Sequence, residues 1–366
     1  MFAFPCAPLR FIPLLLALGS GDSVAHWAPE IDTSVQWTWT VEQKLELGEM
    51  SMEAQSSFGS RVQGPLVGLS LSVRDELELR VHDRVLARSD ERLESLQRHY
   101  DHARRTTRTR IGSGTSTGVD ARKEELLTVS RLEEATVRFD RDGEGDEPRV
   151  LPAEGESVEE EWLWGLDEEL DLRGLLDGQA RELGERWHLD EASVRRLLRP
   201  GGDLRLRVEE QESSEATNIA ELGWLTSATF MDRDSYAFGR AHYAKVVTDE
   251  GRRFAQIDVE VRVEGDGDVY DSLKRLTEGR SRARSWVDYV RGAELEQATV
   301  LRGELYWDLE ARRADSLDLR GELEAFLEVE YDMSPIGRDD LRWLLTAELR
   351  GELRIEVRSS PLSDED

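Results

Sequence analysis

The side chains of this chain that could do acid–base chemistry are its many carboxylates. The sequence holds 77 Asp and Glu residues against 48 Lys and Arg residues, which gives a formal net charge of −29. Glycoside hydrolases use two facing carboxylates as acid and base, but with so many acids no particular pair stands out. A carboxylate-based hydrolase is therefore an alternative function for which the sequence offers no catalytic residues.

Two acidic turns and one pair of histidines are the places where a metal could bind. The turns at 140–147 and 264–268 resemble calcium loops, yet neither has the glutamate that closes a twelve-residue loop. His99 and His102 would share a helical face, but no third ligand follows at a known spacing. We expect no cofactor and no defined metal site, and weak calcium binding at the surface is a further alternative.

The sequence motifs of nucleophilic and nucleotide chemistry are absent. There is no Gly-x-Ser-x-Gly elbow, no phosphate loop and no dinucleotide fingerprint, and the only cysteine is Cys6. The strong negative charge would repel nucleic acid and anionic lipid. These features favour a protein that is not an enzyme and that has no nucleic-acid partner.

The first 25 residues have the pattern of a signal peptide. Arg10 precedes a short apolar run at 11–18, and the Ser-Val-Ala sequence at 23–25 has small residues at the cleavage positions. The pattern predicts export to the periplasm or the extracellular space. No later stretch is apolar for long enough to cross a membrane as a helix, so we expect no transmembrane segment in the mature chain.

The clearest pattern is a phrase, Leu-Arg-Gly-Glu-Leu, that occurs three times near the end of the sequence. Its copies are 301–305, 319–323 and 349–353. Each copy lies in a run where apolar and polar residues alternate, which is the period of a half-buried strand. The three glycines, Gly303, Gly321 and Gly351, fall on the apolar face of these strands.

The repeated phrase also suggests how the strands pair. A hairpin that turns near Arg312 would place Gly303 opposite Gly321 and Arg302 opposite Glu322, so that unlike charges face each other. A second turn in the following connection would place the third glycine opposite the second. Glycine inside a strand usually marks a bend or a close approach. We therefore expect a row of three glycines at a bend in the sheet, and a ligand groove is the alternative.

Tryptophans on the same apolar faces are candidates to line such a groove. Trp37 and Trp39 lie on the apolar face of a predicted strand at 35–47, and Trp307 follows the first copy of the phrase. They could line a sugar or lipid site, although sheet core is the favoured interpretation. The candidate groove or packing row consists of Gly303, Gly321, Gly351, Trp307, Trp37 and Trp39.

The middle of the chain changes period. Apolar residues at every fourth position from Val158 to Leu170 predict an amphipathic helix that begins near 156. Asp190 predicts the cap of a second helix that ends at Leu198. The stretch 89–105 fits either a helix or a strand.

These elements predict a mainly β (α+β) fold with long, curved antiparallel strands, either cup-like as in a half-barrel or two-lobed, and a short helical insert. The expected divisions are a signal peptide at 1–25, an N-terminal β lobe at 26–155, a helical insert at 156–203, a C-terminal β meander lobe at 204–358 and a disordered tail at 359–366.

Several motifs resemble a known group of proteins. They are 171–176, Trp187, 197–204, 239–243 and 303–310. Their order resembles uncharacterised secreted β-rich proteins of planctomycete-type bacteria. The resemblance implies export and a mainly β fold, and it brings no catalytic residues.

The function that the sequence favours is a non-enzymatic, exported protein of the cell envelope or periplasm. Such a protein would bind an apolar ligand or a protein partner on the continuous apolar face of its sheet.

Overall fold

The computed structural model describes most of the chain. The described residues are 23–56, 61–65, 69–89, 92–113, 122–141, 147–208, 235–270, 290–332 and 341–362. Residues 1–22, which hold most of the predicted signal peptide and Cys6, lie outside them. So do most residues between 268 and 290.

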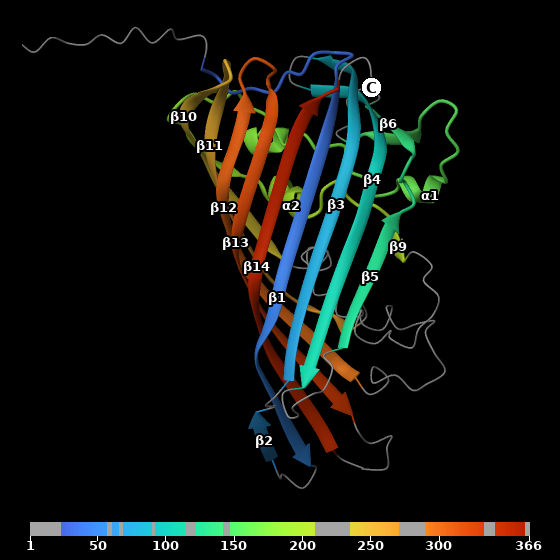
Figure 1. Ribbon diagram of the computed structural model, residues 1–366, viewed down its shortest axis with the longest axis vertical. Helices are drawn as coiled ribbons and strands as arrows, with labels where there is room; N and C mark the ends of the chain where they lie inside the picture. The colour runs from blue at the N-terminus through green and yellow to red at the C-terminus, as the bar shows by residue number, and fades with distance from the viewer. Residues whose placement is uncertain are drawn as a thin grey trace, which may run out of the picture.

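Within the described residues, fourteen strands form one antiparallel sheet, and this confirms the mainly β prediction. The strands are β1 (Ser34–Ser56), β2 (Arg61–Pro65), β3 (Leu69–Ser89), β4 (Arg92–Ser113), β5 (Arg122–Ser130), β6 (Thr136–Asp140), β7 (Arg149–Pro152), β8 (Arg186–Leu189), β9 (Leu206–Val208), β10 (Tyr236–Asp249), β11 (Arg252–Asp268), β12 (Val290–Asp308), β13 (Arg313–Asp332) and β14 (Leu341–Pro361). Figure 1 shows the long strands bending as a group along the length of the molecule.

The sheet is open, and its first strand, β1, lies next to its last strand, β14. Its strand order is β7-β6-β4-β3-β1-β14-β13-β12-β11-β10-β8, so β7 and β8 form the two edges. Strands β1 and β14 pair from Val35 opposite Pro361 to Ser56 opposite Leu341. The strands of the two predicted lobes therefore belong to a single sheet. Because β14 continues to Pro361, the predicted tail from 359 is wrong for its first three residues, which pair with β1.

The stretch 89–105 is strand wherever the structure describes it, with Ser89 at the end of β3 and 92–105 in β4. Its alternation of buried and exposed side chains includes Leu93 and Ala103, which are buried in the core. The helical spacing of Leu93, Leu96 and Tyr100 reflects β-bulges. The pairing of β3 with β4 shifts register between Arg80 and Val81, and this changes the face on which β4 side chains lie.

Residues 153–185 and 190–205, which lie between the short strands β7, β8 and β9, form a layer against one face of the sheet, which we call the cover. It contains α1 (Glu160–Leu163), a 3-10 helix η1 (Arg173–Leu176) and α2 (Glu191–Leu198). Figure 1 shows α2 behind the strands, in the half of the molecule drawn uppermost. Cover residues Leu170, Val194 and Leu197 belong to the same hydrophobic cluster as Trp39 and Leu319 of the sheet.

Tryptophan indole groups tie the cover to its surroundings. Trp39 of β1 donates from Nε1 to the carbonyl oxygen of Leu170 at 3.2 Å. Trp187 of β8 donates to the carbonyl oxygen of Leu175 at 2.8 Å. Each buried hydrogen bond of this kind stabilises a fold by about 1 kcal/mol. Each indole ring thus contributes both a buried apolar surface and a fixed hydrogen bond to the backbone of the cover.

The predicted helix from 156 is wrong, because only the single turn of α1 forms. Gly165 has a φ of +78°, which interrupts the helix directly after α1. The carbonyl oxygens of Asp167 and Glu168 then accept hydrogen bonds from Arg98 instead of from helical N–H groups. The second helix forms as predicted, and the Asp190 side chain accepts the backbone N–H of Ser193.

The predicted glycine row is wrong in register. Gly321 lies opposite Leu301 of β12 and opposite Leu353 of β14, while Gly303 lies opposite Leu319. Each glycine is thus offset by two residues from the next, and each lies opposite a leucine of the adjacent strand. The predicted charge pairing is wrong for the same reason, since Arg302 faces Arg320.

The turn between β12 and β13 explains this shift. Asp308 accepts the backbone N–H groups of Glu310 and Ala311 at 2.8 and 2.9 Å. This forms a tight turn that ends at Arg312, whose φ is 54°. The turn is centred before the predicted position, and a β-bulge beside Trp307 shifts the pairing back by one residue, which leaves the observed offset of two.

The glycines nevertheless sit where strands approach each other closely. A Cβ atom added to Gly303, Gly321 or Gly351 would lie 1.8, 1.9 or 1.7 Å from a carbonyl oxygen of the adjacent strand. Gly321 also separates Leu319, in the cluster beneath the cover, from Leu323, in a second hydrophobic cluster further along the sheet. These observations support the interpretation of a bend.

Candidate ligand-binding cleft

The residues predicted to form a groove lie on one face of the sheet but do not build a cavity. Trp37, Trp39 and Trp307 are at most 2% exposed and belong to the core beneath the cover. Trp307 also donates to the carbonyl oxygen of His26 at 3.1 Å. Of the glycines, Gly303 borders two hollows on the opposite face, which is charged.

A larger cavity lies between the edge strand β7 and helix α2. Its volume is about 1030 Å³, which is enough for a small-molecule ligand. The residues that line it come from Arg141, β7, the segment around α1 and one side of α2. We call this space the cleft, and its lining is Arg141, Glu147–Pro152, Val158, Glu160, Leu163–Glu168, Ala192, Arg195, Arg196, Arg199 and Gly202.

The local sequence explains why α2 presents arginines to the cleft. Ser193, Val194, Leu197 and Leu198 are buried, so the other positions of this two-turn helix face outward. The cap at Asp190 fixes where the helix begins and hence which residues point into the core. As a result Arg195, Arg196 and Arg199 line the cleft.

Neighbouring acids hold the central arginine of α2 in place. Arg196 donates to Asp167 and Glu169 at 2.9 and 2.8 Å. Burial disfavours the charged guanidinium, but the carboxylates of Glu169 and Asp167 outweigh this effect, so the pKa of Arg196 is raised. Arg196 therefore stays charged at the rim of the cleft.

The other wall of the cleft is apolar. Val150, Leu151 and Pro152 of β7, with Val158, are partly exposed along it. Trp164 stands at the rim and is 61% exposed, the largest aromatic side chain on the described surface. An aromatic ring that is left in water beside a cavity is suited to covering an apolar ligand.

The acids around the cleft hold the backbone of the cover in place through hydrogen bonds and ion pairs. Burial raises the pKa of Glu169, with Arg173 and Arg196 opposing this shift. Its carboxylate accepts the backbone N–H of Gly174 at 2.6 Å as well as the Arg196 guanidinium. Glu168 accepts hydrogen bonds from Arg141 and Arg173. These contacts fix the backbone, and they do not resemble a pair of catalytic carboxylates that face one substrate.

The histidines do not form the metal site that was considered for them. His82 and His99 flank Asp101, with nitrogen–oxygen distances of 3.0 and 3.4 Å, whereas His102 contacts Glu78 and Glu133. Among the described residues, no group of three His, Cys, Asp or Glu side chains has the geometry to hold a metal ion.

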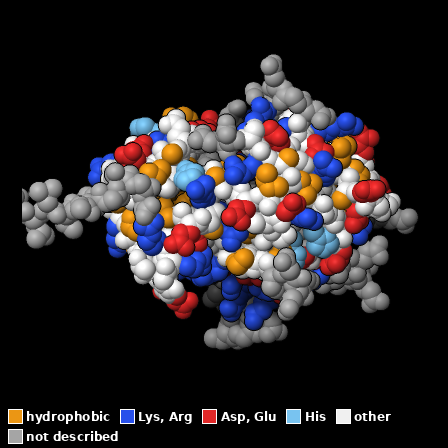
Figure 2. Space-filling model, turned by 90° about the horizontal axis from the view of Figure 1, so that it is seen from above, with side chains coloured by type: hydrophobic (Ala, Val, Ile, Leu, Met, Phe, Trp, Pro, Cys, Tyr) orange, Lys and Arg blue, Asp and Glu red, His pale blue; other side chains and the backbone are white. Residues whose placement is uncertain are grey.

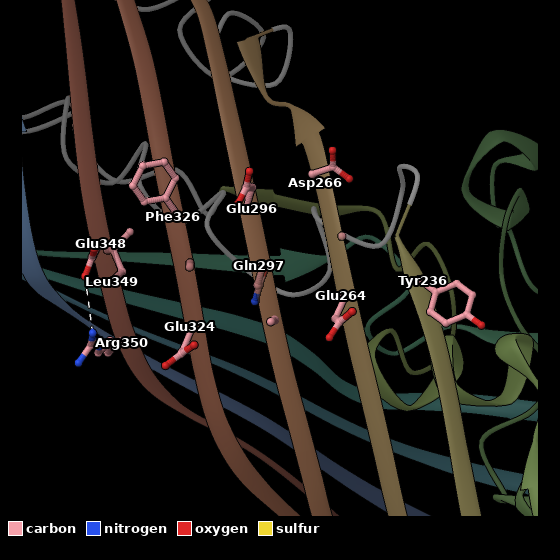
Figure 3. A pocket seen from close by; sticks show the side chains of 13 residues that line it. Tyr236, Glu264, Asp266, Glu296, Gln297, Glu324, Phe326, Glu348, Leu349 and Arg350 are labelled. Atoms are coloured by element: carbon pink, nitrogen blue, oxygen red, sulfur yellow. Dashed lines mark ion pairs between the residues drawn. The ribbon is translucent and has the colours of Figure 1, made fainter.

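A further hollow, of about 610 Å³, lies on the charged face of β10 to β14. Figure 3 shows its side chains rising from neighbouring strands, with Arg350 paired to Glu348 at 3.6 Å. Five carboxylates and this arginine line it, namely Glu264, Asp266, Glu296, Glu324, Glu348 and Arg350. It would repel anions, in contrast to the cleft.

The sequence alone does not predict the cleft, because the residues that line it come from several separate segments. Arg195 and Arg196 were visible signals, since they lie on the polar side of the predicted helix. Trp164, however, was assigned to a helix that does not form, and β7 was not predicted. The partners of α2 could therefore not be placed.

The upper end of the molecule is mixed in charge. Seen from the upper end of the molecule in Figure 2, basic and acidic side chains alternate with scattered apolar ones. No helix within the described ranges is both long and apolar enough to cross a membrane.

Comparisons with known proteins find only distant likenesses. No family model and no curated protein matches the chain. Among solved structures, a FadL homologue of Pseudomonas aeruginosa has 9% identity, 90% coverage of each chain and a TM-score of 0.22. The secretin domain β-barrel of InvG from the Salmonella SPI-1 injectisome has 8% identity, covers 91% of this chain and 64% of its own, and has a TM-score of 0.14. OccK7 of Pseudomonas aeruginosa has 9% identity, covers 90% and 99%, and has a TM-score of 0.13. Structural similarity at these TM-scores does not indicate a shared function.

Proposed function

We propose that this protein is a non-enzymatic, exported binding protein of the cell envelope and that it holds an apolar ligand in the cleft between β7 and α2. The observation that carries the proposal is the cleft itself, which combines an apolar wall, an exposed tryptophan and a volume of about 1030 Å³. An apolar wall beside polar groups that can fix the orientation of a ligand is typical of binding pockets.

Two further features support the proposal. The acids beside the cleft are held by arginines and backbone N–H groups, so they serve the structure. The pattern at 1–25 supports export, because it has the charge, the apolar run and the small residues of a signal peptide.

A fluorescence titration of the purified protein with 1-N-phenylnaphthylamine tests the proposal. We expect saturable enhancement of the probe, and native mass spectrometry should detect a one-to-one complex. Trp164→Ala should weaken binding about fivefold, which corresponds to roughly 1 kcal/mol.

Tyr236→Ala is the matched control, because Tyr236 is 64% exposed but lines the acidic hollow on the other face. This variant should bind the probe like the unmodified protein. Absence of saturable binding, or equal losses in both variants, would rule out the cleft as the site.

A further inference from the structure

The lining of the cleft is richer in arginine than the chain as a whole. Among the described residues that line it, five are arginines and four are carboxylates. In the full sequence, by contrast, acids outnumber bases by 77 to 48. The arginines are Arg141, Arg149, Arg195, Arg196 and Arg199. An anionic group is therefore attracted to the cleft more than to the acidic hollow on the charged face.

Two of these arginines lie at the C-terminal end of α2. Arg195 is in the last turn of the helix and Arg199 directly follows it, and both side chains line the cleft. They are 29% and 35% exposed. Arg195 is held by Glu191 at 2.9 Å and by the Ser235 hydroxyl at 2.8 Å. Arg199 donates from Nε to the carbonyl oxygen of Gly202 at 3.3 Å, and its guanidinium lies 4.0 Å from the Asp203 carboxylate.

Such anchoring matters for recognition of an anion. A guanidinium that is already positioned loses little side-chain freedom when a ligand binds. Arginine also presents several N–H donors in one plane, which suits the oxygens of a carboxylate or a phosphate. The opposite wall, formed by Val150 and Leu151 of β7 and by Trp164, suits an alkyl chain.

We infer that the ligand of the cleft is an amphipathic anion, with its alkyl chain along β7 and its carboxylate or phosphate headgroup at Arg195 and Arg199. The inference rests on the proposed function and adds the class of ligand to it. It explains why the apolar wall and the arginines of α2 line the same cavity.

Calorimetric titration of the purified protein with decanoate, decyl phosphate and 1-decanol, each below its aggregation threshold, tests the inference. At least one of the two anions should bind tenfold or more tightly than 1-decanol. Tighter binding of decanoate assigns a carboxylate headgroup, and tighter binding of decyl phosphate assigns a phosphate.

Variants of Arg199 test where the headgroup lies. Arg199→Gln should lower the affinity for the preferred anion at least fivefold and leave that for 1-decanol unchanged, whereas Arg199→Lys should keep part of the preference. Arg320→Gln removes the same charge from a side chain that is 63% exposed on the other face of the sheet, and it should change neither affinity. Circular dichroism should confirm that each variant is folded.

Each negative result of these titrations contradicts a different part of the two proposals. Equal affinities for the anions and 1-decanol would overturn the anion inference and leave the apolar-ligand function standing. Unchanged anion binding in folded Arg199→Gln would overturn the assigned headgroup position. Absence of binding by all three ligands would overturn both proposals.

Discussion

Arg98 of β4 forms a bidentate ion pair with Asp83 of β3, through nitrogen–oxygen distances of 2.7 and 2.8 Å. The two side chains are enclosed, with exposures of 0% and 7%. The same guanidinium donates to the carbonyl oxygens of Asp167 and Glu168 at 2.8 and 2.7 Å. Both of these residues line the cleft, so one buried arginine links the sheet to the site.

Removing one member of this ion pair should destabilise the protein strongly. Burial disfavours the charge on Arg98, but the Asp83 carboxylate outweighs burial and raises the pKa of Arg98, which stays protonated. Asp83→Ala would leave that charge buried and unpaired. We expect a loss of about 3–5 kcal/mol in the free energy of unfolding, measured by urea denaturation.

The double variant Asp83→Leu with Arg98→Met provides the comparison for this prediction. It removes both charges, and it should recover part of the stability that the single variant loses. A single variant that loses less than about 1 kcal/mol would contradict the role of this pair.

Gly321→Ala should destabilise the bend in the sheet. The added Cβ would lie 1.9 Å from the carbonyl oxygen of Val300, and backbone cannot yield as a flexible side chain can. We expect a loss of about 1–3 kcal/mol in thermal or urea unfolding.

Gly292→Ala is the matched control within the same meander. Nothing lies within 4 Å of the position of its Cβ, and its φ is not in the left-handed region. Its stability should change by less than about 0.5 kcal/mol. Equal effects of the two substitutions would show that the close approach at Gly321 is unimportant.

Asp308 should make the turn between β12 and β13 sensitive to acid. Burial alone would raise the pKa of Asp308, but the N–H groups of Ala311 and Glu310 and the Arg252 guanidinium together lower it. A lowered pKa in the folded state means that the stabilisation is fully present above the ordinary value of about 3.8. It is lost as the pH falls below that value and through the folded pKa.

Asp308→Asn should therefore be less stable than the unmodified protein by about 1–2 kcal/mol near neutral pH. The difference between the two should shrink as the pH falls below about 4. Urea unfolding at a series of pH values measures this difference. A difference that stays constant down to pH 2 would contradict the ionic role of Asp308.

The sequence predicts the strands of this fold better than their pairing. The alternation around Trp37 and Trp39 marks β1 because one face of a strand is buried. The register of β12 and β13 depends instead on how the Asp308 side chain closes the turn and on a bulge beside Trp307. A shift of two residues keeps every side chain on its face, so hydrophobic alternation alone cannot detect it.

The candidate site was even harder to predict from the sequence than the strand pairing. Asp190 and the apolar positions of α2 predict that helix correctly, because its cap and its amphipathic face are local features. Leu166 and Leu170 have helical spacing but are buried in irregular backbone, where Gly165 and the contacts of Arg98 override local preference. The cleft depends on these tertiary contacts.

Photolabelling tests most directly whether an apolar ligand occupies the cleft. The purified protein is irradiated with a decyl diazirine probe, and the labelled residues are mapped by proteolysis and mass spectrometry. Saturable labels should fall on peptides from 147–168 and 190–202, and excess 1-decanol should suppress them. Labels confined to β12, β13 and β14, or labels that 1-decanol does not suppress, would contradict ligand binding in the cleft.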